Sequence, residues 1–449
     1  MTERAVKSRA IFAACVGNLF EWYDFTVYAL FAPYLAASFF PTAESSVALV
    51  RTFLTFGAGF AIRPVGAILI GAYGDRAGRK AALTLTIWIM AAGTLLIALA
   101  PGYATIGVFA PLLLLLGRLL QGLSAGGEVG SASAFLVESA TAGSRGATAA
   151  WLQASMGMSN ILGALVAFTV SETLSIDQLH RWGWRVPFLI GLLIAPAGLL
   201  LRRLVSETPS FAADLARRRT ALAGTPSPLF QTWRAHRGAL AVGFGLSTFW
   251  AVAVYVLNVF TPVYVQVAFH FTATQAFAAS LVGNVLFVTT CLAAGRLSDR
   301  VGRSPVMAAS ALALLATVLP LYLWLQASQS SAVLIVVLCA FGIMVATFVG
   351  VAPVALSDLF PIGVRATSIS LLYNVAFTVF GGFAPAILTW FTRELKGSAM
   401  APAGYVMSAA VVALLTLPFY GRHRDVGSPE AVEFAPVAAP TESGGPFRS

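Results

Sequence analysis

The stretch Gly71–Lys80, GAYGDRAGRK, recurs 224 residues later as Gly295–Ser304, GRLSDRVGRS. Both copies carry an Asp-Arg pair followed by a Gly-Arg pair at the same spacing, so that Asp75 aligns with Asp299. Each copy joins one long apolar run to the next. An internal repeat of this kind is typical of a membrane protein built from two parallel halves.

A second pair of short motifs repeats at nearly the same interval. Glu138 precedes Arg145 by as many residues as Asp358 precedes Arg365. Six apolar segments come before a basic, proline-containing loop and six come after it. The predicted organisation is an N-terminal half at 1–204, a cytoplasmic linker at 205–237, a C-terminal half at 238–420 and a disordered tail at 421–449.

The composition indicates a membrane protein. Hydrophobic residues make up 58% of the chain and charged residues only 10%, against about 25% charged in soluble domains. A membrane-spanning helix needs roughly 20 consecutive apolar residues. We therefore predict an all-α membrane protein with twelve transmembrane helices in two six-helix halves. The spans are expected near 11–38, 47–72, 82–100, 104–135, 146–170, 184–204, 238–267, 274–294, 306–325, 332–355, 368–391 and 402–420.

The positive charge of the chain predicts its orientation. The sequence holds 28 Lys and Arg residues against 18 Asp and Glu, a formal charge of +10. With twelve spans and an internal N-terminus, 21 of the 28 basic residues fall on the cytoplasmic side, where basic loops are retained. Both termini are therefore predicted to be cytoplasmic, in the cell inner (plasma) membrane. The basic charge implies no nucleic-acid partner.

Several motifs resemble those of one transporter family. The paired Gly-x-x-x-Asp-Arg-x-Gly-Arg loops resemble the signature of the major facilitator superfamily. Six further segments resemble its metabolite:proton symporter branch, and the resemblance covers residues 10–420. These segments are GNLFEWYDF (Gly17–Phe25), GFAIRPVGA (Gly59–Ala67), GRLLQGLSAGGE (Gly117–Glu128), WGWRVPF (Trp182–Phe188), SETPSF (Ser206–Phe211) and SLLYNVAFTVFGGFAP (Ser370–Pro385).

The resemblance implies a class of substrate. Members of that branch take up citrate, tricarballylate, α-ketoglutarate, shikimate, or proline and betaines. The stretch from Gly71 to Gly126 is most similar to the citrate and tricarballylate permeases, whereas EWYDF at 21–25 is shared by many other members. Parallel repeats of this kind place the substrate site between the halves, near the middle of the membrane.

Ionisable residues within the spans are candidates for function, because a charge inside the bilayer is costly. The first half contains Glu21, Asp24, Arg63, Arg118 and Glu128 within its spans. From 238 to 420 no acid or base lies clear of a helix end. The sequence therefore predicts that charge chemistry is confined to the N-terminal half.

The acids among these residues are candidates for proton coupling. Glu21 and Asp24 share one helical face with Tyr28. Burial favours the protonated carboxyl and an approaching guanidinium favours the ionised form, so a carboxylate can take up and release a proton as its surroundings change. We assign coupling to Asp24, Glu21 and Glu128. The alternatives are a permanent hydrogen-bonded network for the first two and a gate ion pair for Glu128.

The arginines are candidates for substrate binding. Arg118 matches the arginine of the superfamily's fourth-helix motif, and Gln121 follows one turn later. Arg63 lies about 18 Å along the helix from Asp75, a depth compatible with a central cavity. A guanidinium binds a carboxylate through two parallel hydrogen bonds. Structural ion pairing or packing is the alternative for both. Gln121 and Tyr28 are the neutral side chains of the first half that are predicted to bind the substrate. In the second half the neutral side chains expected to orient a hydroxy-acid, or else to bond between helices, are Tyr255, Asn258, Tyr264, Asn284, Tyr373 and Asn374.

The repeated loops are expected to control opening rather than to bind substrate. Their glycines permit tight turns, and an Asp at a helix end accepts backbone N–H groups. The acid and base pairs of the second motif are expected to form an inner gate. The residues predicted for gating are Gly71, Asp75, Arg76, Gly78, Arg79, Glu138, Arg145, Asp299, Arg300, Gly302, Arg303, Asp358 and Arg365.

Together these features predict proton-coupled uptake (symport) of a small organic acid, such as the di- or tricarboxylate citrate, by alternating access. Uptake of a zwitterion such as proline or betaine, and drug or metabolite efflux, are the alternatives. No catalytic or phosphate-binding motif is visible, which argues against an enzyme. Cys15, Cys291 and Cys339 lack metal-ligand spacing, so no metal or cofactor is expected. The expected partners are the organic acid, protons and membrane lipids, with no obligate protein partner.

Overall fold

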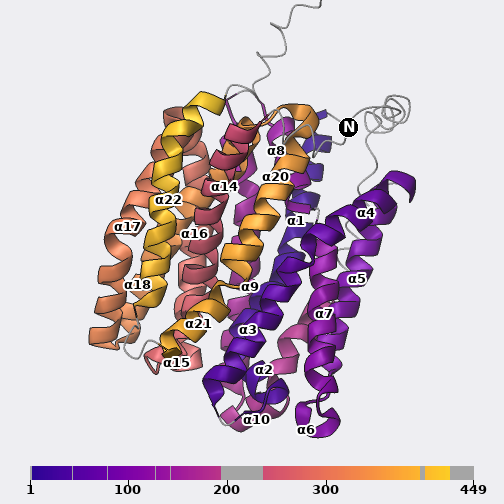
Figure 1. Ribbon diagram of the computed structural model, residues 1–449, viewed down its shortest axis with the longest axis vertical. Coiled ribbons are helices and arrows are strands. Elements are labelled where there is room, and N and C mark those ends of the chain that lie inside the picture. The colour runs from indigo at the N-terminus through magenta and orange to yellow at the C-terminus, as the bar shows by residue number, and fades with distance from the viewer. Residues whose placement is uncertain are drawn as a thin grey trace, which may run out of the picture.

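The computed structural model describes residues 3–42, 44–77, 79–126, 128–141, 143–193, 236–394 and 400–424. Within these residues the chain is helical and contains no strand (Figure 1). The predicted linker at 205–237 lies outside this set except for its last two residues, and so does the predicted tail from residue 425 onward.

The first part of the chain forms helices that are joined by short connections. They are α1 (Glu3–Leu30), α2 (Ala32–Phe39), α3 (Ser45–Ala61), α4 (Arg63–Ala77), α5 (Arg79–Leu99), α6 (Tyr103–Ile106), α7 (Phe109–Ala125), α8 (Glu128–Ser139), α9 (Arg145–Thr173), α10 (Ile176–Arg181) and the 3-10 turn η1 (Gly183–Arg185).

The second part contains two π-helical segments among its α-helices. Its elements are α14 (Arg237–Val252), the π-helix η2 (Ala253–Phe260), α15 (Thr261–Ala268), α16 (Ala273–Val301), α17 (Arg303–Ser328), α18 (Ser331–Val349), α19 (Ala352–Asp358), α20 (Ile362–Ala376), the π-helix η3 (Phe377–Gly382), α21 (Ala384–Glu394) and α22 (Ala401–His423). Widened turns of this type occur often at functional sites.

Nine helical stretches among the described residues are long and apolar enough to cross a membrane. Helix α1 and two shorter apolar helices, Thr84–Leu99 and Gly183–Leu193, lie at the three remaining predicted spans. The prediction of an all-α membrane protein with twelve transmembrane helices is confirmed. The nine stretches are Ser45–Ile70, Phe109–Ser139, Arg145–Thr173, Arg237–Ala268, Ala273–Val301, Arg303–Ser328, Ser331–Asp358, Val364–Thr392 and Ala401–His423.

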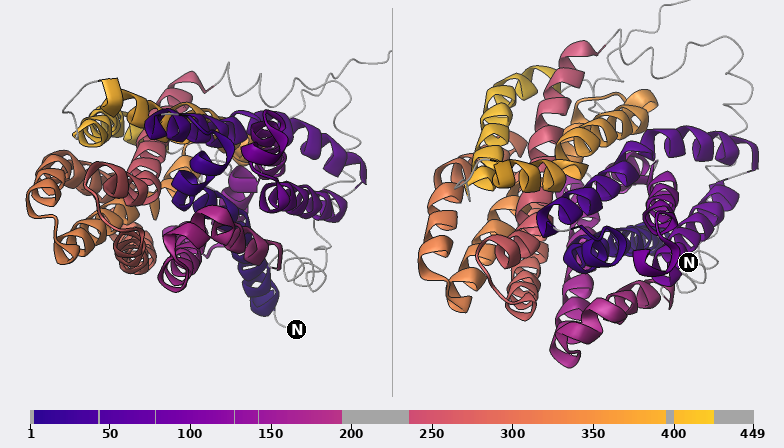
Figure 2. Two further views of the ribbon diagram at one scale, coloured as in Figure 1. Left: turned by 90° about the horizontal axis from the view of Figure 1, so that it is seen from below. Right: turned by 60° about the horizontal axis from the view of Figure 1, so that its bottom comes forward.

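The two parts of the chain form bundles that lie side by side, with the N-terminal helices in indigo to magenta and the C-terminal helices in rose through orange to yellow (Figure 2). Helix α9 packs along α16, α8 along α20, and α3 against α21, so each of these pairs joins the two bundles. We call the end where α1 begins and α22 ends the upper end, as drawn in Figure 1. The lower end carries α2, α6 and α10.

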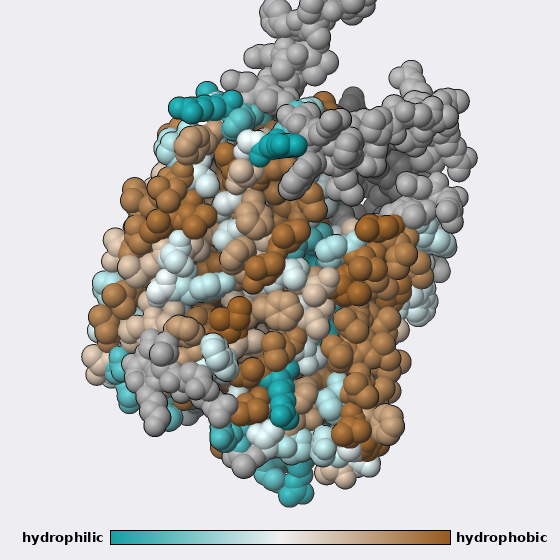
Figure 3. Space-filling model, in the orientation of Figure 1, coloured by the Kyte–Doolittle hydropathy of each residue, from teal (hydrophilic) through white to brown (hydrophobic). Residues whose placement is uncertain are grey.

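The outer surface matches a lipid environment. Apolar side chains cover the flanks and hydrophilic ones gather mostly toward the ends (Figure 3). Trp88, Leu193 and Leu415 are among the large apolar side chains that are more than half exposed. A large contiguous apolar surface is rare on a soluble monomer. This chain is therefore a multi-pass membrane protein.

Glycines allow α9 and α16 to approach closely. A Cβ atom at Gly295 would lie 2.6 Å from the Cβ of Ala150 and 2.6 Å from the carbonyl oxygen of Gly146. Small residues at such crossings let helix backbones pack directly against each other. The close contact between α9 and α16 therefore depends on glycine at Gly146 and Gly295, where a side chain would not fit.

Replacing Gly295 by valine is expected to lower the free energy of unfolding by about 1–3 kcal/mol, because the added atoms overlap α9. The melting temperature of the purified protein in detergent measures this loss. Gly404→Val is the matched control, since a Cβ atom at Gly404 meets nothing within 4 Å. Equal falls in melting temperature for the two variants would contradict the close packing.

Candidate functional site

Four of the five ionisable side chains predicted from the sequence lie buried together in the first bundle. Arg63 and Arg118 are 0% exposed, Glu21 is 5% exposed and Asp24 is 4% exposed. With the buried amide of Gln121 they form what we call the central cluster, contributed by α1, α4 and α7. Buried charges need compensation from partners, so the contacts of each group decide what it can do.

A break between α3 and α4 positions Arg63. Helix α3 ends at Ala61, and α4 begins at Arg63 with Pro64 as its second residue. Proline is tolerated in the first turn of a helix, where its missing N–H leaves no bond unmade. The span therefore restarts at the depth of the central cluster.

Asp24 and Arg118 are connected through two polar side chains. An Nη atom of Arg118 donates to Oε1 of Gln121 at 2.7 Å, and Nε2 of Gln121 lies 3.3 Å from a carboxylate oxygen of Asp24. The same nitrogen donates to the hydroxyl of Thr94 at 2.9 Å, and that hydroxyl donates to Asp24. The network joins α1, α5 and α7, all in the first bundle.

Thr94 is a contact that the sequence reasoning missed. It lies on α5, inside the segment GTLLIALAPGY (Gly93–Tyr103) that resembles the citrate and tricarballylate permeases. That resemblance was the only available signal, because a threonine in an apolar span usually bonds to its own helix. Thr94 does this as well, through the carbonyl oxygen of Met90 at 3.1 Å.

Arg63 and Glu21 form a second, looser pair. Their nearest nitrogen and oxygen are 4.0 Å apart, the limit for an ion pair. None of the three guanidinium nitrogens of Arg63 has a hydrogen-bond partner among the described residues. Tyr255 and Tyr373 of the second bundle lie close enough to both charges to interact with them electrostatically. This pair therefore faces the boundary between the bundles.

Aromatic rings hold both guanidinium groups. The Cζ atom of Arg63 lies 4.2 Å from the ring centroid of Phe60 and 4.6 Å from that of Phe25. Arg118 lies 4.4 Å from the same Phe25 ring and 4.5 Å from Tyr28. A desolvated cation over a ring gains about 2 kcal/mol. Stacking occupies the faces of a guanidinium and leaves its N–H edges available to an anion.

The neutral residues predicted to orient a substrate occupy three different settings. Tyr28 stacks beside Arg118, and its hydroxyl donates to the carbonyl oxygen of Thr52 at 3.1 Å. Tyr373 stacks on Phe377 with ring centroids 3.7 Å apart. Asn374 instead donates to the carbonyl oxygen of Gly126 at 2.8 Å, which is a bond between the two bundles. The side chain of Glu128, a predicted coupling residue, lies outside the described residues.

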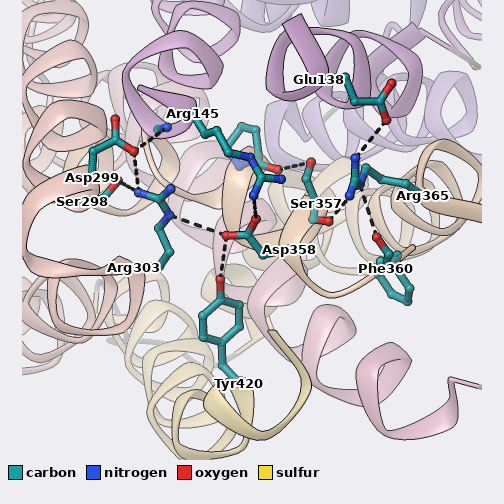
Figure 4. A network of polar contacts seen from close by, with 12 residues as sticks. Glu138, Arg145, Ser298, Asp299, Arg303, Ser357, Asp358, Phe360, Arg365 and Tyr420 are labelled. Carbon is teal, nitrogen blue, oxygen red and sulfur yellow. Dashed lines mark hydrogen bonds and ion pairs between the residues drawn. The ribbon is translucent and has the colours of Figure 1, made fainter. Parts of the chain in front are cut away.

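The upper end is joined by a network of ion pairs (Figure 4). The two carboxylate oxygens of Asp299 accept the backbone N–H groups of Gly146 and Ala147, each at 2.8 Å, at the start of α9. A carboxylate is stabilised at a helix N-terminus by the exposed N–H groups and the helix dipole. Arg303 also binds Asp299, at 2.7 Å. One bundle thus caps a helix of the other.

Asp358 and Arg365 extend this network. Asp358 lies 3.1 Å from Arg145 and 3.6 Å from Arg303, and the Tyr420 hydroxyl donates to it at 3.4 Å. Arg365 pairs with Glu138 at 2.9 Å. Glu138 and Arg145 of the first bundle therefore pair with Arg365 and Asp358 of the second, and Asp358 also pairs with Arg303 of its own bundle.

Of the other residues predicted for gating, the structure describes the surroundings of two, Gly302 and Arg300. Gly302 turns the chain between α16 and α17 with a φ of 94°, a conformation that favours glycine. Arg300 is exposed. The predicted gating residues in the first copy of the repeat have side chains outside the described part of the structure. They are Gly71, Asp75, Arg76, Gly78 and Arg79.

Aromatic contacts join the bundles toward the lower end. Phe53 packs on Phe260 with ring centroids 5.7 Å apart, and Phe31 packs on Phe277 at 6.0 Å. Each pair contains one residue from each bundle. Ionic contacts above and aromatic contacts below therefore enclose the buried central cluster.

Comparison with known proteins shows the family. A family model described as "Sugar (and other) transporter" matches residues 10–225. A citrate-proton symporter of Salmonella typhi is 38% identical over 414 residues, which cover 92% of this chain and 94% of the relative. This chain belongs to the major facilitator superfamily. Its relatives in this superfamily are named as transporters, so the chain is a transporter and not an enzyme.

Further members of the superfamily differ in the substrates that their names give. A citrate-proton symporter of Klebsiella pneumoniae is 36% identical, covering 93% of this chain and 92% of the relative. A proline/betaine transporter of Salmonella typhimurium is 34% identical, covering 91% and 82%. The solved structure of the proton:xylose symporter XylE, bound to 6-bromo-6-deoxy-D-glucose, matches with a TM-score of 0.74 at 17% identity, covering 94% and 96%. The structural match supports the predicted fold.

Replacing Asp358 by asparagine is expected to lower the free energy of unfolding by about 1–3 kcal/mol, between the values for exposed and buried ion pairs, because the paired side chains are 14% to 24% exposed. Two arginines would lose their shared partner. Thermal unfolding in detergent measures the change. Asp177→Asn is the matched control, because Asp177 is 68% exposed in its pair with Arg181 and should contribute less than about 1 kcal/mol. A similar small change in both variants would show that the network contributes little.

Proposed function

We propose that this chain takes up a small organic acid together with protons, by alternating access across the inner (plasma) membrane with both termini in the cytoplasm. The substrate is a di- or tricarboxylate such as citrate. One observation carries the proposal: two fully buried guanidinium groups share the ring of Phe25 and lie beside two buried carboxyl groups. The citrate-proton symporters among the relatives cover nearly the whole chain, which supports it.

Arg63 is the group that a substrate entering between the bundles meets first. It faces Tyr255 and Tyr373 across the boundary, and its nitrogens have no hydrogen-bond partner among the described residues. A carboxylate can accept two parallel hydrogen bonds from one guanidinium. Arg118, on the same Phe25 ring, is placed to take a second carboxylate when that ring moves. Two cations on the same ring favour a substrate with more than one acidic group.

A substrate carboxylate and the ionised side chains of Asp24 and Glu21 compete for the same guanidinium groups. Asp24 reaches Arg118 through Gln121, and Glu21 lies beside Arg63. A substrate carboxylate that binds an arginine weakens the field that keeps the neighbouring acid ionised. That acid then takes up a proton. Asp24 is the proposed principal coupling residue, Glu21 assists it, and Glu128 remains the proposed relay or gate partner.

The membrane potential opposes the entry of an anion, which is why uptake of an organic acid requires co-transported protons. Moving an anion into a negative interior costs roughly 2.3 kcal/mol per charge for each 100 mV. A di- or tricarboxylate would be excluded unless protons accompanied it. The upper network of Asp299, Arg303 and Asp358 would open toward the cytoplasm, and the aromatic contacts of Phe53 and Phe31 would open toward the outside.

A zwitterion such as betaine or proline is the second candidate substrate. Trp22, Phe60 and Tyr255 lie around Arg63 with Glu21 beside them. Aromatic rings of this kind also hold quaternary ammonium groups. The proline/betaine transporter among the relatives supports this alternative. Competition of labelled citrate uptake by unlabelled betaine separates the two candidates, because a citrate transporter would ignore betaine.

Replacing Asp24 by asparagine should abolish uphill citrate uptake in proteoliposomes with an imposed pH gradient, while exchange of internal for external citrate continues. Asparagine keeps the shape of the side chain but cannot carry a proton. Asp177→Asn, an exposed change of the same kind, should leave both activities intact. Unimpaired uphill uptake by the Asp24 variant would exclude Asp24 as the coupling acid.

Replacing Arg63 by lysine should raise the KM for citrate about 10- to 100-fold, because two charge-assisted hydrogen bonds of about 1.5–3 kcal/mol become one point contact. Initial uptake rates over a range of citrate concentrations measure this. Arg181→Lys is the control, since Arg181 is exposed and pairs only with Asp177 among the described residues. An unchanged KM in the Arg63 variant would remove Arg63 from the substrate site.

A further inference from the structure

A small polar cavity lies on the side of α1 that faces away from the central cluster. Its α1 residues, Thr26 and Leu30, come two and six positions after Asp24, which places them on roughly the opposite helical face. The volume available inside is about 10 Å³, which is about the space of one water molecule. We call its polar residues the amide pocket: Thr26, Asn160, Asn258, Ser280 and Asn284.

The amide pocket contains buried polar atoms without partners. Asn160 is 3% exposed and Asn284 is 5% exposed. Among the described residues, Nδ2 of Asn160, Nδ2 of Asn258 and Oδ1 of Asn284 have no hydrogen-bond partner. Buried polar groups are nearly always satisfied, by protein or by ordered water. Three such atoms around one cavity therefore indicate a ligand.

The surrounding bonds leave one polar atom of Asn284 and one of Asn160 without a partner. Nδ2 of Asn284 donates to the carbonyl oxygen of Ser280 at 2.8 Å, so Oδ1 of Asn284 is left as an acceptor. The other end of the Asn160 amide lies 2.6 Å from the Thr26 hydroxyl. A hydroxyl can donate or accept, so the Thr26 hydroxyl can bond either the oxygen or the nitrogen of the Asn160 amide. In both orientations the other polar atom of that amide has no partner among the described residues.

These atoms define the chemistry of the ligand. No residue that lines the cavity is ionisable, so neither an anion nor a metal cation finds a charged partner there. An apolar ligand would leave the amides unsatisfied. We propose that the amide pocket binds one hydroxyl group, whose O–H donates to Oδ1 of Asn284 and whose oxygen accepts from Asn160 or Asn258. In the compact arrangement of this structure, that oxygen belongs to a water molecule.

The amide pocket bridges the two bundles. Thr26 and Asn160 belong to α1 and α9, whereas Asn258 and Asn284 belong to η2 and α16. The π-helix η2 also carries Tyr255, which approaches Arg63. When the bundles separate, the same amides face the space between them, where the alcohol group of a hydroxylated acid is the second source of a hydroxyl. That second source rests on the proposed function, whereas the water site does not.

X-ray hydroxyl-radical footprinting of the full-length protein in detergent tests the site, because bound water yields radicals that oxidise adjacent side chains. Leu30 and Val259 line the cavity and are otherwise buried. They should be oxidised several-fold faster than Leu114, which is fully buried on α7 and does not line the cavity. Oxidation of all three at one slow rate in the wild-type protein would overturn the proposal.

Isosteric variants assign the signal to the amides. Asn160→Leu and Asn284→Leu, singly and together, replace a buried amide by an apolar group of similar volume. Oxidation at Leu30 and Val259 should fall toward the Leu114 rate in each variant that remains folded by its melting curve. Undiminished oxidation in folded variants would overturn the role of the amides. The wild-type measurement stands without any variant.

Two acids then distinguish the sources of the hydroxyl. Citrate carries a hydroxyl group and tricarballylate is the same acid without it. Protection of Leu30 and Val259 by citrate but not by tricarballylate would identify the substrate alcohol as a ligand. Oxidation unchanged by either acid would assign the pocket to water alone, and equal protection by both would overturn hydroxyl recognition. Failure of proton-coupled uptake would count against the proposed function and leave the footprint unaffected.

Discussion

Arg63 and Arg118 stack on the ring of Phe25, and their burial constrains every helix around them. A guanidinium keeps its charge in any protein environment, so the surrounding helices must supply the compensation. Here α1 supplies two acids and the shared ring, α3 supplies Phe56 and Phe60, and α5 supplies Thr94. The positions of these helices follow from that requirement.

The two arginines are compensated in different ways, and this separates their roles. Arg118 is tied to Asp24 through Gln121 within the first bundle. Among the described residues, Arg63 makes a long contact with Glu21, interacts with Tyr373 and stacks on rings near the second bundle. A group with unsatisfied donors at a moving boundary is suited to exchange partners. A group that is hydrogen-bonded to a neighbouring acid through Gln121 is suited to sense that exchange.

The sequence was sufficient for the fold and for the inventory of charges. Apolar runs of membrane-spanning length predicted the helices, and the scarcity of intramembrane charges singled out Arg63, Arg118, Glu21 and Asp24. It was insufficient for contacts that depend on how helices rotate against one another. Asn374 follows Tyr373 directly, yet it bonds to the backbone of Gly126 rather than facing the cluster. Thr94, the shared Phe25 ring and the π-helical turn at Tyr255 had no pattern of their own, because each is decided by tertiary packing.

The two ends of the bundle respond in opposite ways to the surrounding electrolyte. The pairs of Asp358 with Arg145 and Arg303 are partly accessible, so dissolved ions screen them. The ring contacts of Phe53 with Phe260 and of Phe31 with Phe277 carry no charge, and salts that are excluded from protein surfaces strengthen them. Raising the concentration of sulfate or phosphate therefore loosens the upper closure while it tightens the lower one. Under the proposed alternating access, the balance between the two closed ends is therefore expected to depend on the concentration of such salts.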